Sequence, residues 1–267
     1  MGGTSCALAV GNARRACPEP PGWRKMEGRM SASSPKRVFS ALVPILAGTA
    51  GVLSMVLITQ LLDSGVLPIW SVWDNSDVNF TFTLQMLMLP VSFAAVVFVY
   101  FYDPQACKTF LTVRFDRTDT RARDWLVLGP LLAIVFTLGT TMYMSVSVGS
   151  QGGQMNGTFL GLLPFVLLFA TTNAWTEEIF TRFVIVAGLH GKLSPVAVCW
   201  VSALVFGLPH FFGTPSGITG VITAGLMGWL LAKSVLETRS MTWALLIHFL
   251  QDVVIFGGGA MVIAGQA

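Results

Sequence analysis

Seven long apolar runs follow one another along this chain, and they constrain its fold more than any other feature. They cover residues 38–62, 80–102, 125–148, 158–188, 194–212, 216–236 and 241–265. An α-helix rises about 1.5 Å per residue, so about 20 apolar residues cross the ~30 Å hydrocarbon core of a bilayer. Nearly all of the runs are long enough. The sequence therefore predicts an all-α fold, a polytopic membrane helix bundle of about seven transmembrane helices.

The composition is that of a chain that avoids water. Charged residues make up 11% of the sequence and hydrophobic residues 54%, whereas soluble domains carry about 25% charged residues. We therefore expect the lipid bilayer as a partner and a single membrane domain over residues 38–265. The net charge of +3 is explained by membrane topology, and no nucleic-acid partner is expected.

Lysine and arginine are concentrated in alternate connecting segments. Seven lie in residues 1–37 and five in residues 103–124. Three more lie in or beside the later connectors of the same set: Lys192, Lys233 and Arg239. The other connectors contain none: 63–79, 149–157 and 213–215. Because basic loops stay in the cytoplasm, the N-terminus is predicted to be cytoplasmic and the C-terminus outside, in the plasma membrane if the source is bacterial. Residues 1–37, polar and basic, are interpreted as a disordered cytoplasmic tail.

A small set of ionisable side chains lies inside the apolar runs. Its members are Glu177, Glu178, Arg182, His210, His248 and Asp252. A charge at mid-bilayer depth costs about 2.5–3.5 kcal/mol on insertion scales, so such residues usually face the protein interior and carry function. The alternative is a set of structural ion pairs that hold helices together.

The first cluster has the spacing of one helix. Residues four apart share a helix face, so Glu178 and Arg182 are predicted to form an ion pair. Glu177 points about 100° away and is predicted to have no partner on its own helix. An unpaired carboxylate in apolar surroundings suits general-base work, and its partner must come from another helix.

Two later helices offer candidate partners. His210 follows Phe206 by four residues and comes directly after Pro209, which leaves the carbonyl of Val205 without its helical donor. His248 and Asp252 are also four residues apart and share a helix face. A core histidine in the first case, and an aspartate that merely orients its histidine in the second, are the simpler alternatives.

Three further patterns concern helix packing. The fourth run is too long for a simple span and is predicted to bend or break near Gly188 or to extend past the bilayer surface. Ser194 and Pro195 are typical of an N-cap and a first helical position. Small residues at four-residue intervals predict a close helix contact: Gly220, Ala224 and Gly228.

These motifs, in this order on three late helices, resemble the CAAX prenyl protease and bacteriocin-processing (CPBP) family of intramembrane glutamic proteases. The motifs are Glu177-Glu178-x-x-x-Arg182, Phe206-x-x-x-His210 and His248-x-x-x-Asp252, and the resemblance covers about residues 158–256. The family includes the eukaryotic Ras-converting prenyl protease and the bacterial abortive-infection proteins.

The resemblance implies a role for each matching residue. Glu177 and His210 would activate a water, and His248 and Asp252 would stabilise the oxyanion. The remaining matched residues would support the site: Glu178, Arg182 and Phe206. Eukaryotic members generally have Asn where this chain has Asp252. An ionised carboxylate cannot donate to an oxyanion, so Asp252 is either protonated or orients His248.

The implied function is an intramembrane endopeptidase that cleaves a peptide or membrane-protein substrate without a metal or another cofactor. Two alternatives stay open. Two histidines and two carboxylates could ligate zinc with an open position for water, although no His-Glu-x-x-His helix is present. A transporter or scaffold with structural buried charges is the other alternative, although residues 38–148 show no inverted repeat of the charged helices.

Overall fold

The computed structural model describes residues 35–115 and 119–267. The predicted tail, residues 1–37, lies almost entirely outside these residues. Seven of the helices in the described ranges are long and apolar enough to cross a membrane, so the predicted all-α membrane bundle is confirmed. No strand occurs in either described range.

The membrane helices agree closely with the apolar runs. In chain order they are α2 (Pro35–Asp63), α3 (Ser76–Tyr102), α5 (Thr120–Ser150), α6 (Gly157–Glu178) continued by the π-helical segment η1 (Ile179–Ala187), α7 (Pro195–Gly207) continued by the 3₁₀ segment η2 (Leu208–Phe212), α8 (Gly217–Thr238) and α9 (Thr242–Gln266). A short helix, α4 (Pro104–Phe110), lies in a connector and was not predicted, because seven residues carry too little periodicity to be recognised.

Polar residues in the connectors set several of the helix starts. The side chain of Asn75 accepts from the first turn of α3, and Asp119 caps α5 in the same way. These two helices therefore begin four or five residues before the apolar runs that predict them. Ser194 caps α7 with Pro195 in the first turn, as predicted.

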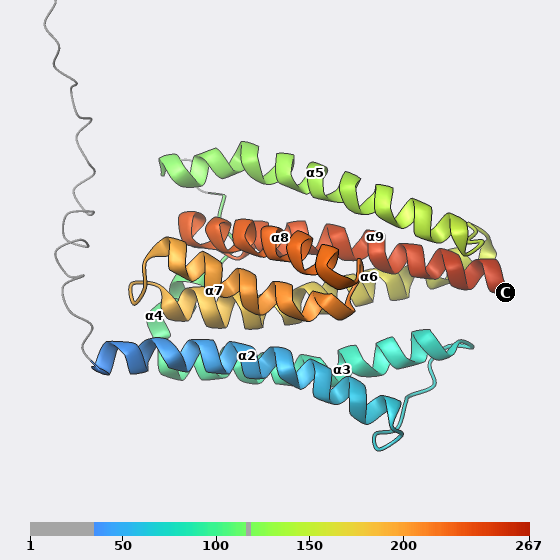
Figure 1. Ribbon diagram of the computed structural model, residues 1–267, viewed down its shortest axis with the longest axis horizontal. Helices are drawn as coiled ribbons and strands as arrows, with labels where there is room; N and C mark the ends of the chain where they lie inside the picture. Colours follow the sequence, from blue (N-terminus) through green and yellow to red (C-terminus); the bar gives the residue numbers. More distant parts are fainter. Residues whose placement is uncertain (1–34, 116–118) are drawn as a thin grey trace, which may run out of the picture. The chain divides into compact units, whose positions relative to one another are not determined.

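Within residues 39–267 the helices run side by side, with α5 along one edge and α2 along the opposite edge (Figure 1). The closest pairs are α6 with α9, α7 with α8, and α5 with α9. The predicted small-residue contact lies between α7 and α8, where a Cβ added to Gly228 would come within 3.0 Å of Phe206. The helices that carry the charged motifs are also joined, since α6 packs on α9 and α7 packs on η1.

The long fourth span ends one residue after Gly188, at Leu189, after which a turn begins. Its helix remains continuous through Leu189, and its irregular part is η1, which begins directly after Glu178. All nine residues of η1 are buried. Added Cβ atoms on Gly48 and Gly51 of α2 would collide with Phe180, so two glycines let α2 approach this segment closely.

Candidate active site

A cavity of about 470 Å³ lies among α5, α6, α8, α9 and the end of η2. The four residues for which the resemblance implies a catalytic role all line it: Glu177, His210, His248 and Asp252. Residues far apart in sequence therefore come together around one space. Much of the remaining wall is apolar, from side chains such as Val135, Phe136 and Met227.

The imidazole of His248 is the centre of the polar cluster. Its Nδ1 lies 2.8 Å from Glu178 Oε1. Its Nε2 lies 3.7 Å from Glu177 Oε2 and 3.6 Å from Asp252 Oδ2. Because a carboxylate only accepts, Nδ1 carries a proton and donates to Glu178. The other ring nitrogen is left facing the cavity.

Glu178 also forms the predicted ion pair with Arg182. Oε2 of Glu178 lies 3.2 Å from Nε of Arg182, and both side chains are fully buried. A guanidinium nitrogen of Arg182 donates to the hydroxyl of Thr181, and Cζ lies 4.1 Å from the centre of the Phe206 ring. The pair thus has charge compensation and an aromatic face, and it joins α6 and η1 to α7.

Phe206 is also in contact with both histidines of the motifs. Its ring centre lies 4.6 Å from that of His210 and 5.5 Å from that of His248. This one buried ring therefore packs against three polar side chains: Arg182, His210 and His248.

Asn173 is a member of the cluster that the sequence reasoning missed. Its side-chain nitrogen lies 3.2 Å from Glu177 Oε1 and 3.2 Å from Asp252 Oδ2. Its oxygen accepts from Gln85 Nε2 at 3.0 Å, which determines which way the amide points. The prediction that Glu177 has no partner on its own helix is therefore wrong, because Asn173 lies one turn earlier on the same face. The four-residue spacing could have revealed it.

His210 lies at the end of the helical chain that begins with α7. Its Nδ1 lies 2.7 Å from the carbonyl oxygen of Phe206. A carbonyl only accepts, so Nδ1 donates and Nε2 is the nitrogen with a free lone pair. The carbonyl that Pro209 was expected to leave free is that of Val205. The contact of His210 uses the next carbonyl, that of Phe206. No hydrogen bond or ion pair joins His210 to Glu177 among the described residues.

A glycine on α8 holds the backbone of His210 close. A Cβ added to Gly220 would lie 2.4 Å from the carbonyl oxygen of His210 and 2.1 Å from that of Pro215. Real Cβ atoms do not approach oxygen so closely. Only glycine allows η2 and the connector after it to pack on α8 in this way, and the position of His210 depends on this packing.

A protein metal site needs several ligating side chains that converge on one point. Across residues 35–115 and 119–267, no group of three or more His, Cys, Asp or Glu side chains is arranged to hold a metal ion.

Residues 159–254 match the family model described as type II CAAX prenyl endopeptidase Rce1-like. This segment, just over a third of the chain, is similar to the Rce1-like domain. The resemblance stated from the motifs is thereby confirmed for these residues. No curated protein and no solved structure matches the chain. The matched segment contains all three motifs, whereas Gln85 and the α5 side of the cavity lie outside it.

Proposed function

We propose that this protein is an intramembrane endopeptidase of the glutamic type, in which Glu177 and His210 activate a water. The observation that carries the proposal is the exposure of Glu177. Its side chain is 18% exposed, against 6% for Asp252 and 0% for Glu178. Of the clustered carboxylates, Glu177 is the one that a water in the cavity reaches most easily.

The proposed reaction begins with a water between the two activating groups. Glu177 takes one proton from this water as general base, and the lone pair on Nε2 of His210 accepts a hydrogen bond from the O–H that remains. The resulting hydroxide attacks the peptide carbonyl carbon. Glu177 then returns its proton to the leaving nitrogen, and the carbon–nitrogen bond breaks. The new carboxyl group gives its proton to the amine, so the products are a carboxylate and an ammonium group.

The negative charge that develops on the carbonyl oxygen needs a donor. Nε2 of His248 faces the cavity, and in the imidazolium form of His248 this nitrogen carries a proton that can be donated to the oxyanion. Glu178 supports this role because it accepts from Nδ1 and so orients the ring. Asp252 lies beside the same nitrogen, on the oxyanion side of the site.

Asn173 acts in this scheme as a positioning residue. Its amide group donates to Glu177 and Asp252 together, which keeps two carboxylates at a defined separation. Arg182 pairs with Glu178, and the Phe206 ring packs against both histidines. These supporting contacts keep Glu177 facing the cavity, where its remaining lone pairs can accept from water.

The proposed topology follows the distribution of lysine and arginine. Residues 1–37 would form a cytoplasmic tail, residues 38–265 the membrane protease domain, and the C-terminus would lie outside. In this orientation α6 begins outside with Gly157 and reaches the cytoplasmic half of the membrane at Glu177, roughly 30 Å of helix farther at about 1.5 Å per residue.

The decisive experiment compares membranes that contain wild type with membranes that contain Glu177→Gln at equal abundance. Mass spectrometry of protein termini should find membrane-associated precursors that accumulate with the variant and new termini that occur only with wild type. Glutamine keeps the size of the side chain and its bond with Asn173 but does not accept a proton. Identical sets of termini would contradict the proposal.

A further inference from the structure

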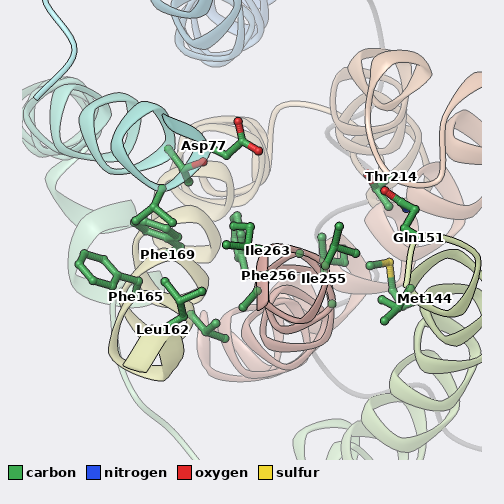
Figure 2. A pocket seen from close by; sticks show the side chains of 18 of the residues that line it. Asp77, Met144, Gln151, Leu162, Phe165, Phe169, Thr214, Ile255, Phe256 and Ile263 are labelled. Atoms are coloured by element: carbon green, nitrogen blue, oxygen red, sulfur yellow. The ribbon is translucent and has the colours of Figure 1, made fainter. Parts of the chain in front are cut away.

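A second cavity of about 470 Å³ lies toward the other end of the membrane helices. It is bounded by the start of α3, the end of α5, the first half of α6 and the second half of α9. Figure 2 shows Phe165 and Phe169 on one side and Met144 with Gln151 on the other, with side chains of α9 between them. We refer to it as the distal cavity.

The distal cavity and the active-site cavity are neighbours. Three residues line both of them: Thr214, Ile255 and Phe256. Phe256 is half-buried and packs edge-on against Phe169, with ring centres 5.7 Å apart. The two cavities therefore adjoin at Phe256, so a substrate in the active-site cavity lies next to the distal cavity.

The walls of the distal cavity have two kinds of chemistry. One set of lining residues is apolar or aromatic and includes Leu162, Val166, Phe169 and Ile263. The helix ends around the cavity supply polar groups: Asp77, Thr81, Ser147, Gln151 and Gln266. An apolar pocket with a few polar groups is typical of a ligand site. A lipid acyl chain has no donors or acceptors that could bind these polar groups, whereas a peptide needs hydrogen-bond partners for its backbone N–H and C=O.

We propose that the distal cavity binds apolar side chains of the peptide substrate beyond the cleaved bond. This inference rests on the proposed endopeptidase function and adds a substrate class to it, namely peptides with bulky apolar residues at a set distance from the bond. Gly259 lies seven residues after Asp252 and Ile263 eleven, about 10 and 16 Å along α9. An extended peptide covers about 3.3 Å per residue, so the bulky residues lie about three to five positions from the cleaved bond.

The helix ends around the distal cavity belong to the side without lysine and arginine. The nearby connectors are 64–75 and 151–156. In the proposed topology these face away from the cytoplasm. The substrate segment held in the distal cavity therefore belongs to the outer half of the membrane.

Two neighbouring glycines of α9 provide a matched pair of variants. Gly259 lines the distal cavity, and Gly257 lines neither cavity. A Cβ added at either position meets nothing within 4 Å. Gly259→Leu therefore adds a bulky side chain to the wall of the distal cavity without a backbone collision, and Gly257→Leu adds the same side chain to the same helix outside it. Both changes alter helix propensity equally.

The test uses purified wild type, Gly259→Leu and Gly257→Leu with a mixture of synthetic peptides that have apolar segments of varied side-chain size. Mass spectrometry identifies the products. For peptides with Phe or Leu three to five positions from the bond, the cleavage rate of Gly259→Leu should be at least about 10-fold below that of wild type. This is the range of discrimination that misfit in an apolar pocket produces. Peptides with Ala there should be cleaved at the wild-type rate. Gly257→Leu should match wild type for all peptides.

A second measurement separates this inference from the proposed function. Peptides that carry a photoreactive benzoylphenylalanine in the bulky position are irradiated with Glu177→Gln, and cross-linked residues are mapped. Cross-links to Phe165, Phe169 or Ile263 that disappear with the added Gly259→Leu change support the distal cavity even if wild type cleaves no peptide. Two results would overturn the inference. One is that wild type cleaves the peptides and both leucine variants show the same preference for side-chain size. The other is that the peptides cross-link only to residues outside the distal cavity.

Discussion

The side-chain nitrogen of Asn173 lies 3.2 Å from both Glu177 Oε1 and Asp252 Oδ2. One amide thus holds two acidic side chains from different helices, α6 and α9. Gln85 donates to the oxygen of the same amide from α3. Three helices therefore meet at a residue that lies outside the family-like motifs.

Asn173 gives the first prediction. Asn173→Ala removes both donated bonds and should lower kcat about 10- to 100-fold with little change in KM. Asn173→Asp should be at least as damaging, because it places a third carboxylate beside two others and cannot donate. Adding Asp252→Asn to Asn173→Asp returns a donor to this pair, so activity should recover in part. The variants are compared at equal abundance and thermal stability. If Asn173 has only a structural role, the double variant should not recover activity, and the pH–rate profile of Asn173→Asp should match that of wild type.

Glu177 and Glu178 should respond differently to the same change. Glu177→Gln should reduce cleavage about 10²–10⁴-fold, the usual contribution of a general base, with normal abundance. Glu178→Gln leaves the fully buried Arg182 without its counter-charge. Breaking a buried pair costs about 3–5 kcal/mol, so abundance and melting temperature should fall as well. Western blots of membranes and thermal unfolding in detergent measure both. Equal stability of the two variants would contradict the structural role of Glu178.

Metal removal distinguishes the proposed mechanism from a zinc hydrolase. A Glu177–His210 pair needs no ion, so cleavage should survive prolonged treatment with a strong chelator. Asp252→Asn should keep or raise activity, because an amide donates to an oxyanion better than a carboxylate does. A zinc ligand at this position would have to be ionised. Cleavage lost with chelator, restored by zinc and abolished in Asp252→Asn would establish the metal mechanism instead.

Gly220 should be essential for the position of His210. Gly220→Ala puts a Cβ within 2.4 Å of the His210 carbonyl oxygen, so η2 must move away from α8. We expect a loss of cleavage of about 10-fold or more, since misplacement of a reacting group by about 1 Å costs up to 10²-fold. Gly139→Ala is the control, because this glycine also lines the active-site cavity and its added Cβ meets nothing within 4 Å. Similar activity of the two variants would show that His210 does not depend on this contact.

Topology is tested by labelling of single cysteines in a background without the four native ones. Ser71→Cys lies in the connector before α3 and Phe115→Cys in the connector before α5, and both positions are exposed. In closed cells a membrane-impermeant maleimide should label the first, and the second only after permeabilisation. Labelling of both from the same side would contradict the seven-helix topology.

Local sequence determined much of this protein. The apolar runs are long enough to require membrane helices whatever their partners, because an unpaired backbone is too costly in lipid. The pair of Glu178 and Arg182 also follows from spacing on one helix, as does the cap at Ser194. The apolar runs begin four or five residues after the true starts of α3 and α5, which follow Asn75 and Asp119. The first turns of these helices are polar, so hydropathy does not detect them. Each of these features depends on residues within a few positions of one another.

The tertiary structure decided the contacts of the candidate site. His248 Nδ1 could have faced Asp252 on its own helix, but it donates to Glu178, 70 residues earlier. The amide of Asn173 reaches Asp252 across 79 residues. The π-helical turns of η1 lie where α2 packs through Gly48 and Gly51 against Phe180. Helical spacing determines which side chains share a face, but the rotation and depth of each helix come from packing against its neighbours. Those two quantities decide which carboxylate faces the cavity and which is buried behind it.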